Sequence, residues 1–189
     1  NAPARVIAFD FDDTLVKFTQ SDTSYQLRFR NVLSKVRSLV NTESESTIPT
    51  LFAIITNESL SRFVKEAALS KQLNSKCNKI KRFCNDLDLP ILVLAPTAKD
   101  SNRKGIGGNC WGLLEEVFQS KGFVVDKSVS LFVGDANGEG EIGSFSSMDS
   151  DKAFAETVGV NFKSAKEFFD PPTLNSGEES TPTPAEEEG

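Results

Sequence analysis

Four short apolar runs recur along the chain, and each ends where polar residues begin. They cover residues 5–9, 51–56, 91–95 and 129–133. Runs of this length with apolar residues at consecutive positions are typical of strands that are buried on both faces of a parallel sheet. A shorter run at residues 158–160 predicts a fifth strand.

Helical patterns lie between these runs. Apolar residues three or four positions apart predict one helix with a buried face formed by Leu73, Cys77, Ile80, Cys84 and Leu87. Two further stripes, at residues 113–118 and 153–158, predict two more helices. Strands that alternate with helices indicate an α/β fold, a Rossmann-like parallel sheet flanked by helices. In such a fold the ligand site lies beyond the carboxyl ends of the strands.

Charge divides the 189 residues into two parts. Six of the 27 acidic residues lie at or after Asp170, where there is no lysine or arginine, so residues 1–169 carry 21 acidic and 21 basic residues. We therefore expect one neutral folded domain at residues 1–169 and a disordered acidic tail at residues 170–189. A neutral domain remains compatible with a polyanionic partner. No apolar run approaches the roughly 18 residues of a membrane span, so no membrane association is expected.

The composition excludes several kinds of enzyme. The chain contains no histidine, which rules out a Ser-His-Asp triad, a phosphohistidine phosphatase and an HExxH zinc site. Its three cysteines fit no CxxC spacing, which argues against a disulfide framework or a zinc cluster. Catalysis in this chain must rest on carboxylates, lysine and hydroxyl groups, with or without a metal ion.

The densest candidate chemistry is an acidic cluster directly after the first apolar run. Asp10, Asp12 and Asp13 follow a strand that is expected to be buried, and three adjacent carboxylates repel one another unless a cation neutralises them. One carboxylate could attack a phosphoryl group while another transfers protons, and Mg²⁺ held by oxygen ligands would balance their charge. A solvated acidic turn is the alternative interpretation.

The segment Asp10–Leu15 resembles the first motif, DxDxT, of the haloacid dehalogenase superfamily. Thr56-Asn57, Lys104 and Gly134-Asp135 are similar to its second, third and fourth motifs and follow in the same order. The resemblance implies a haloacid dehalogenase-like fold, here with a minimal cap or none.

A narrower resemblance, to the polynucleotide 3′-phosphatase family, covers residues 5–169. Thr56-Asn57-Glu58 is similar to its TNQ motif, with Glu58 in place of glutamine, and Arg103-Lys104-Gly105 is similar to its RKP motif. Residues 132–138 are close to its FVGDAAG segment. Asp149 and Asp151 both remain candidates for the family's late aspartate.

The resemblance implies roles for the matching residues. Asp10 would attack phosphorus and form an aspartyl-phosphate, and Asp12 would protonate the leaving oxygen and then activate water. Thr56 and the amide of Asn57 would bind phosphoryl oxygens, and Lys104 would neutralise charge. The ligands of Mg²⁺ would be Asp10, the backbone carbonyl of Asp12, and Asp135.

The function implied is a Mg²⁺-dependent phosphatase that removes 3′-phosphate from DNA ends during DNA repair, as a monomer in the nucleus or, alternatively, in mitochondria. A phosphatase that acts on a small metabolite and a catalytically silent protein that binds DNA ends remain alternatives. The basic segment Lys71–Arg82 is interpreted as a solvated helix face, with contact to a nucleic-acid backbone as the alternative. Phe18, Tyr25 and Phe29 would flank the entrance, where one could stack on the terminal base.

Overall fold

The first described strand of the chain lies in the middle of a six-stranded sheet, and the pairings between the described strands are parallel. The computed structural model describes residues 1–18, 24–41, 48–58, 65–105, 107–138 and 150–171. Its strands are β1 (Ala2–Phe9), β2 (Thr50–Ile55), β3 (Leu92–Leu94), β4 (Phe123–Val125), β5 (Leu131–Gly134) and β6 (Asn161–Ser164). Their order is β3-β2-β1-β5-β6, and β4 pairs with the start of β1. At the end of β1, Phe9 pairs with Ile54 on one side and with Val133 on the other.

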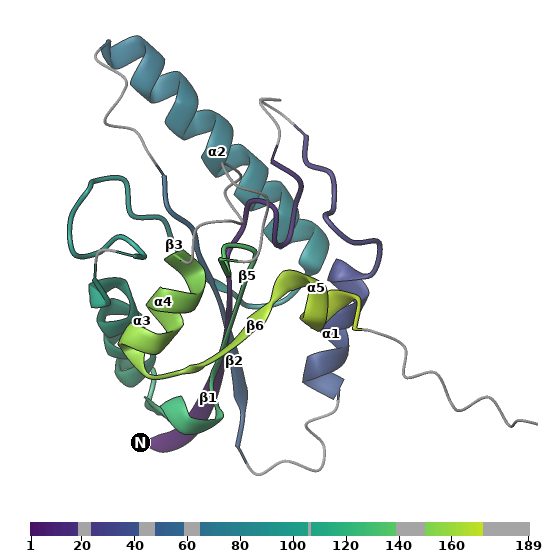
Figure 1. The fold of residues 1–189 in the computed structure, drawn as a ribbon, viewed down its shortest axis with the longest axis vertical. Helices are drawn as coiled ribbons and strands as arrows, with labels where there is room; N and C mark the ends of the chain where they lie inside the picture. Colours follow the sequence, from purple (N-terminus) through teal and green to yellow (C-terminus); the bar gives the residue numbers. More distant parts are fainter. Residues whose placement is uncertain (19–23, 42–47, 59–64, 106, 139–149, 172–189) are drawn as a thin grey trace, which may run out of the picture.

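Helices cover both faces of this sheet (Figure 1). They are α1 (Val32–Asn41), α2 (Glu66–Leu87), α3 (Asn109–Ser120), α4 (Ser150–Val158) and α5 (Ala165–Phe169), with a short 3₁₀ helix, η2 (Lys127–Val129). Residues of α1, α2 and α5 pack in one core cluster with Ile7 and Phe9 of β1, and residues of α3 and α4 pack in a second with Val6 and Ala8. Because alternate residues of a strand face opposite ways, β1 contributes to both cores and is apolar throughout its buried part.

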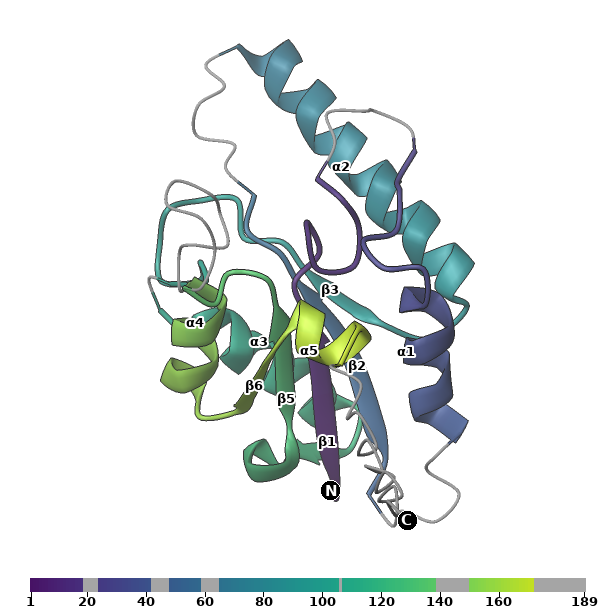
Figure 2. The same cartoon turned by 45° about the vertical axis from the view of Figure 1, so that its right-hand side comes forward.

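Helix α2 extends well beyond the carboxyl edge of the sheet (Figure 2). Its buried residues are Lys76, Lys79, Ile80, Phe83 and Leu87. The predicted face was therefore only partly right, because Leu73 and Cys77 are exposed. The stripe predicted at residues 113–118 also differs, since Leu113 and Val117 are exposed and α3 instead buries Cys110, Trp111 and Leu114.

The predicted strands agree with the structure at three places and differ at two. The runs at residues 5–9, 51–56 and 91–95 correspond to β1, β2 and β3. The run at 129–133 begins too early, because the side chain of Asp126 caps η2 and delays the strand to Leu131. The strand predicted at 158–160 is wrong: α4 ends at Val158, Gly159 turns with φ 79°, and β6 begins only at Asn161.

The described strands form a single sheet with helices on both faces, which confirms the expected α/β fold. Among the described residues, none of the helices is both long and apolar enough to cross a membrane. The predicted acidic tail lies outside the described residues from position 172 onward.

Candidate active site

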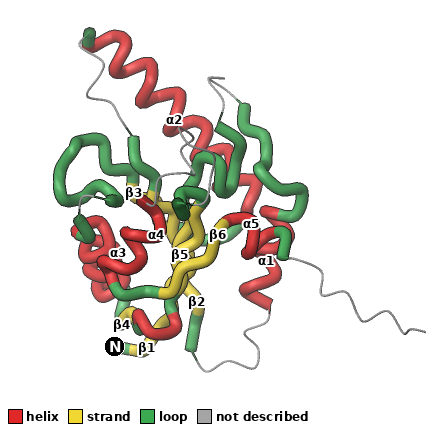
Figure 3. The backbone as a smooth tube through the Cα atoms, in the orientation of Figure 1, coloured by secondary structure: helices red, strands yellow, loops and turns green. Residues whose placement is uncertain are grey.

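The carboxyl end of β1 is the point from which the sheet extends in opposite directions. β2 and β3 lie on one side of β1 and β5 and β6 on the other, and in open α/β sheets ligands bind beyond the carboxyl ends of the strands at such a point. Asp10 directly follows β1, Thr56 directly follows β2 and Asp135 directly follows β5. The carboxyl ends of these strands lie at the end of the molecule away from the N-terminus (Figure 3). The fold thus brings three of the predicted site residues to one edge.

A tight loop carries the chain away from Asp10 and presents Asp12. Isolated bridges pair Asp12 with Val16 and Val16 with Leu27, and the N–H of Asp13 donates to the carbonyl of Val16 at 2.6 Å. Asp13 has a φ of 56°, in the left-handed region that aspartate tolerates better than most residues. This backbone conformation is therefore compatible with an aspartate at position 13.

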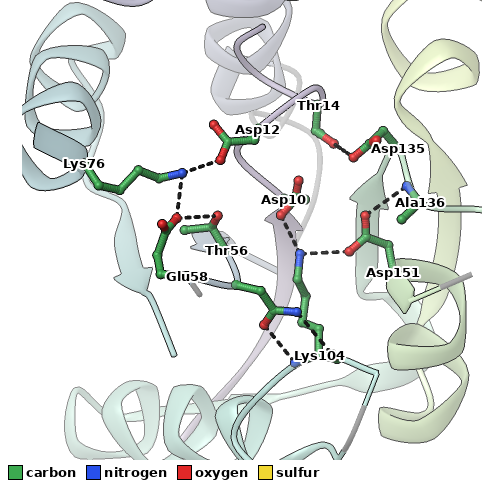
Figure 4. Close-up of polar contacts among 11 residues, drawn as sticks. Asp10, Asp12, Thr14, Thr56, Glu58, Lys76, Lys104, Asp135, Ala136 and Asp151 are labelled. Carbon is green, nitrogen blue, oxygen red and sulfur yellow. Dashed lines mark hydrogen bonds and ion pairs between the residues drawn. The ribbon is translucent and has the colours of Figure 1, made fainter. Parts of the chain in front are cut away.

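Lys104 joins the predicted residues at the centre of the site (Figure 4). Its ammonium lies 2.5 Å from Oδ1 of Asp10 and 2.8 Å from Oδ1 of Asp151, and all three residues are buried. The side chain of Asn57 fixes the backbone of Lys104: Oδ1 accepts from its N–H at 3.0 Å and Nδ2 donates to its carbonyl at 3.1 Å. Asn57 therefore uses its side chain to position Lys104.

Asp151 completes this group from α4. Its Oδ2 accepts from the backbone N–H of Ala136 at 3.1 Å while its Oδ1 faces Lys104. A Cβ atom on Gly134 would lie 2.4 Å from Oδ2 of Asp151, so only glycine leaves room for this carboxylate. Of the two candidates for the late aspartate, Asp151 thus lies in the site, and Asp149 lies outside the described residues.

Three carboxylates lie together at the centre of the site, and two of them contact Lys104. Oxygen atoms of Asp10, Asp135 and Asp151 all lie within 4.8 Å of one another, and the hydroxyl of Thr14 donates to Asp135 at 3.4 Å. Burial raises the pKa of Asp10 to about 8, although Lys104 opposes this, and burial together with the charge of Asp151 raises the pKa of Asp135 to about 6. Burial lowers the pKa of Lys104, but Asp10 and Asp151 outweigh it, so that this pKa lies above its usual value. When ionised, the group carries negative charge in excess of its one lysine.

Asp12 belongs to a second cluster beside the first. Its Oδ2 accepts from the ammonium of Lys76, and Oε1 of Glu58 lies 2.6 Å from the same nitrogen (Figure 4). The hydroxyl of Thr56 donates to Glu58 at 3.4 Å. Burial lowers the pKa of Lys76, but Asp12 and Glu58 outweigh it and keep that pKa above its usual value.

Lys76 is the main correction to the site expected from the sequence. The interpretation of Lys71–Arg82 as a solvated helix face is wrong for Lys76 and Lys79, which are both buried. Lys76 precedes Ile80 by four positions and Phe83 by seven, so it lies on the buried face of α2. That spacing indicates that Lys76 lies on the buried face, although most lysines in proteins are exposed.

The predicted entrance aromatics divide between core and surface. Tyr25 meets Phe83 edge to face with ring centroids 5.5 Å apart, and Phe29 stacks on Phe169 at the same separation. Phe18 is 55% exposed. Next to them lies a hollow whose lining carries four basic side chains and one acidic one: Lys17, Arg28, Arg30, Arg82 and Asp86.

The arrangement of motifs agrees with comparisons to known proteins. Residues 5–169 match the family model described as polynucleotide kinase 3 phosphatase. The chain is 32% identical over 169 residues to the bifunctional polynucleotide phosphatase/kinase of Schizosaccharomyces pombe, covering 87% of this chain and 37% of that protein. It is 27% identical over 192 residues to the polynucleotide 3′-phosphatase ZDP of Arabidopsis thaliana, covering 94% of this chain and 26% of that protein.

Among solved structures, the chain is similar to a HAD-like phosphatase from Mesorhizobium loti, with a TM-score of 0.49 and 17% identity over 85% of this chain and 71% of that one. The chain spans well under half the length of the two curated relatives. The family match itself takes in nearly every described residue, from the central strand to α5, and includes both clusters at the sheet edge. By this match, the chain belongs to the polynucleotide kinase 3 phosphatase family.

Proposed function

We propose that this protein is a Mg²⁺-dependent polynucleotide 3′-phosphatase that removes the terminal 3′-phosphate from DNA through an aspartyl-phosphate on Asp10. The observation that carries the proposal is the buried Asp10 carboxylate at the end of β1, 2.5 Å from Lys104 and grouped with Asp135 and Asp151. Family membership over residues 5–169 and the printed names of the two relatives support a polynucleotide as the substrate.

In the first step, an oxygen of Asp10 attacks phosphorus and the bond from phosphorus to the 3′ oxygen breaks. Asp12 donates a proton to the departing 3′ oxygen, which leaves as a hydroxyl group. In the second step, Asp12 takes a proton from water, the water oxygen attacks phosphorus, and the bond to Asp10 breaks. Inorganic phosphate leaves and Asp10 is regenerated.

Thr56 and Lys104 serve the phosphoryl group. The Thr56 hydroxyl and the backbone amide of Asn57 follow β2 and would donate to phosphoryl oxygens. Lys104, fixed by the side chain of Asn57, would neutralise charge shared between Asp10 and the phosphate. Donors fixed in advance at such a site stabilise the transition state without having to reorganise.

The donor set fits Mg²⁺. Among the described residues, three carboxylates with oxygens within 4.8 Å of one another share one ion-paired lysine, which leaves excess negative charge when they are ionised. Burial, together with the neighbouring carboxylates, raises the pKa values of Asp10 and Asp135. Hard oxygen ligands are those that Mg²⁺ prefers. We assign Asp10, Asp135 and the backbone carbonyl of Asp12 as ligands. The ion would polarise the phosphoryl group and favour the ionised form of Asp10.

The proposal includes the macromolecular substrate, the oligomeric state and the cellular compartment. The partner is DNA that ends in a 3′-phosphate, and we propose a monomer that acts in the nucleus during DNA repair. Removal of the phosphate leaves the 3′-hydroxyl that a polymerase or ligase requires.

The proposed function is tested by phosphate release from one oligonucleotide prepared with either a 3′- or a 5′-phosphate. We expect Mg²⁺-dependent release from the 3′ form and essentially none from the 5′ form. The Asp10→Asn variant, which lacks a nucleophilic carboxylate, should retain its fold and lose activity by more than about 10³-fold.

Three outcomes would contradict parts of this proposal. Equal rates on the two ends would replace it with a general phosphatase. Turnover of sugar phosphates with none of the oligonucleotide would replace it with a metabolite phosphatase. An Asp10→Asn variant with more than about 1% of wild-type activity would remove Asp10 as the nucleophile.

A further inference from the structure

Lys76 reaches the candidate site from a helix that contributes none of the matched motifs. It projects from α2, is 8% exposed, and lies over the ring of Phe11 with its nitrogen 5.1 Å from the ring centre. Its ammonium is shared by the carboxylates of Asp12 and Glu58 (Figure 4). A buried lysine with two acidic partners and an aromatic face is held in one position, unlike a solvated lysine.

The negative charge of Glu58 requires a cationic partner such as Lys76. Glu58 stands where the resembling TNQ motif carries a neutral glutamine, and it lies beside Asp12 and Thr56. Without a cation, two carboxylates would face each other next to the position proposed for a phosphate dianion. Removing one partner of a buried ionic group leaves the others uncompensated, which is strongly unfavourable.

The same lysine affects the Thr56 hydroxyl. Glu58 Oε1 lies 2.6 Å from Lys76 Nζ and 3.4 Å from the hydroxyl of Thr56. The shorter, charge-assisted contact is the stronger of the two. Glu58 is therefore held by Lys76 and only weakly by Thr56, and the Thr56 hydroxyl can turn its proton to a phosphoryl oxygen.

We propose that Lys76 and Glu58 act as one positioning pair for the phosphatase site. Lys76 holds the Asp12 carboxylate in place, and it neutralises Glu58 so that Glu58 does not repel the phosphate or capture the Thr56 hydroxyl. The inference deepens the proposed function and rests on it for the role of Asp12.

The pair is tested by Lys76→Met, Glu58→Gln and the double variant. Lys76→Met leaves Asp12 and Glu58 unpaired, and kcat should fall by about 10²-fold, the scale of losing a well-placed acid or base. KM should rise as well, because an uncompensated Glu58 repels phosphate. Glu58→Gln in the Lys76→Met background removes that charge. It should lower KM again and restore at least about tenfold in kcat/KM.

Two controls separate positioning from folding. Lys81→Met removes an exposed lysine from the same helix and should leave kcat and KM near wild type. Melting temperature is measured for every variant, and it should fall in Lys76→Met and recover in the double variant whether or not any substrate turns over. The inference is overturned if Lys76→Met keeps wild-type kcat and KM, or if Glu58→Gln restores neither kcat/KM nor melting temperature.

Each variant is assayed on the 3′-phosphorylated oligonucleotide and on a small aryl phosphate. If wild type hydrolyses only the aryl phosphate, the proposed substrate is wrong, while the same comparison of variants still tests the pair. If wild type hydrolyses neither, the proposed function fails, and the recovery of melting temperature remains the test of the Lys76–Glu58 pair.

Discussion

Gly134 determines the position of Asp151 because it has no side chain. Its missing side chain makes room for a carboxylate that binds both Lys104 and the N–H of Ala136. The sequence placed Gly134-Asp135 in a motif, but it did not show which residue from elsewhere in the chain fills the space above the glycine. That information depends on the packing of α4 against β5, which no local pattern encodes.

Gly134→Ala should therefore displace Asp151. The added Cβ would lie 2.4 Å from Oδ2 of Asp151 and 2.6 Å from its Cβ. Overpacking of this kind costs about 1–3 kcal/mol, which corresponds to a fall of about 2–12 °C in melting temperature for a domain of this size. We also expect kcat to fall by about 10²-fold, because Lys104 loses a partner that orients it.

The matched control is Gly112→Ala in α3. Nothing lies within 4 Å of a Cβ at that position, and alanine favours a helix over glycine by about 1 kcal/mol. This variant should keep full activity and melt at or slightly above the wild-type temperature. A Gly134→Ala variant that matches it in both respects would show that Asp151 has room to move.

The cysteines should differ in reactivity. Burial raises the pKa of Cys110 to about 11, whereas Cys77 is exposed. Only the thiolate reacts, and at pH 8 a thiol with that pKa is ionised to about one part in 10³. A thiol-specific chromogenic reagent at pH 8 should thus modify Cys77 rapidly in the native protein and Cys110 only after unfolding.

Reactivity of Cys110 should increase as pH rises toward its pKa, because its thiolate fraction then grows. Cys77→Ser should remove the rapid phase. Rapid modification of Cys110 in the native Cys77→Ser protein at pH 8 would contradict the burial of this side chain between α3 and the sheet.

At the scale of elements, the order of strands and helices was predictable and the orientation of helix faces was not. Apolar runs mark buried strands well, and three of them correspond to β1, β2 and β3. Helix α2 differs, because part of it extends past the sheet and its Leu73 is exposed, while Lys76 is buried in the site. Apolar periodicity cannot reveal that a lysine on the buried face meets Asp12 and Glu58 from distant segments.

The start of α5 permits a prediction about a helix end. The Ser164 hydroxyl accepts from the N–H of Glu167 at 3.2 Å, and the Glu167 carboxylate accepts from the N–H of Ser164 at 2.9 Å. This capping box orients a five-residue helix that buries Phe168 and Phe169.

Ser164→Ala should lower the free energy of unfolding by about 1 kcal/mol, measured by urea denaturation. Activity at 25 °C should change little, since α5 supplies no side chain to the two clusters. Lys166→Ala, an exposed change in the same helix that leaves the capping box intact, is the control. Equal stability of the two variants would contradict the role of the capping box.

At the scale of the whole molecule, the basic hollow predicts how the protein responds to salt. Lys17, Arg28, Arg30 and Arg82 line it, and the bridges from Asp12 to Val16 and from Val16 to Leu27 connect it to the candidate site. We expect it to contact DNA phosphates upstream of the 3′ end. Affinity for a long 3′-phosphorylated strand should then fall with salt, with a logarithmic slope of about 0.7 for each phosphate contacted.

Replacing Arg28 and Arg30 together by alanine should reduce that slope, measured as KM against salt concentration. Hydrolysis of a small aryl phosphate should depend far less on salt in every variant. Alanine at Lys121 and Lys127, which flank β4 beside the amino end of β1, is the matched control for loss of two positive charges. An unchanged slope in the arginine variant would place the DNA path elsewhere.

The central position of β1 has a consequence for synthesis of the protein. β1 is made before its partner β5, which follows only after most of the described chain. Until then an apolar strand has an unpaired edge, which is a template for aggregation. Asp10, Asp12 and Asp13 follow it immediately, and charges next to an apolar strand oppose association between chains. The acids that we propose for chemistry in the folded protein would thus also protect the nascent chain.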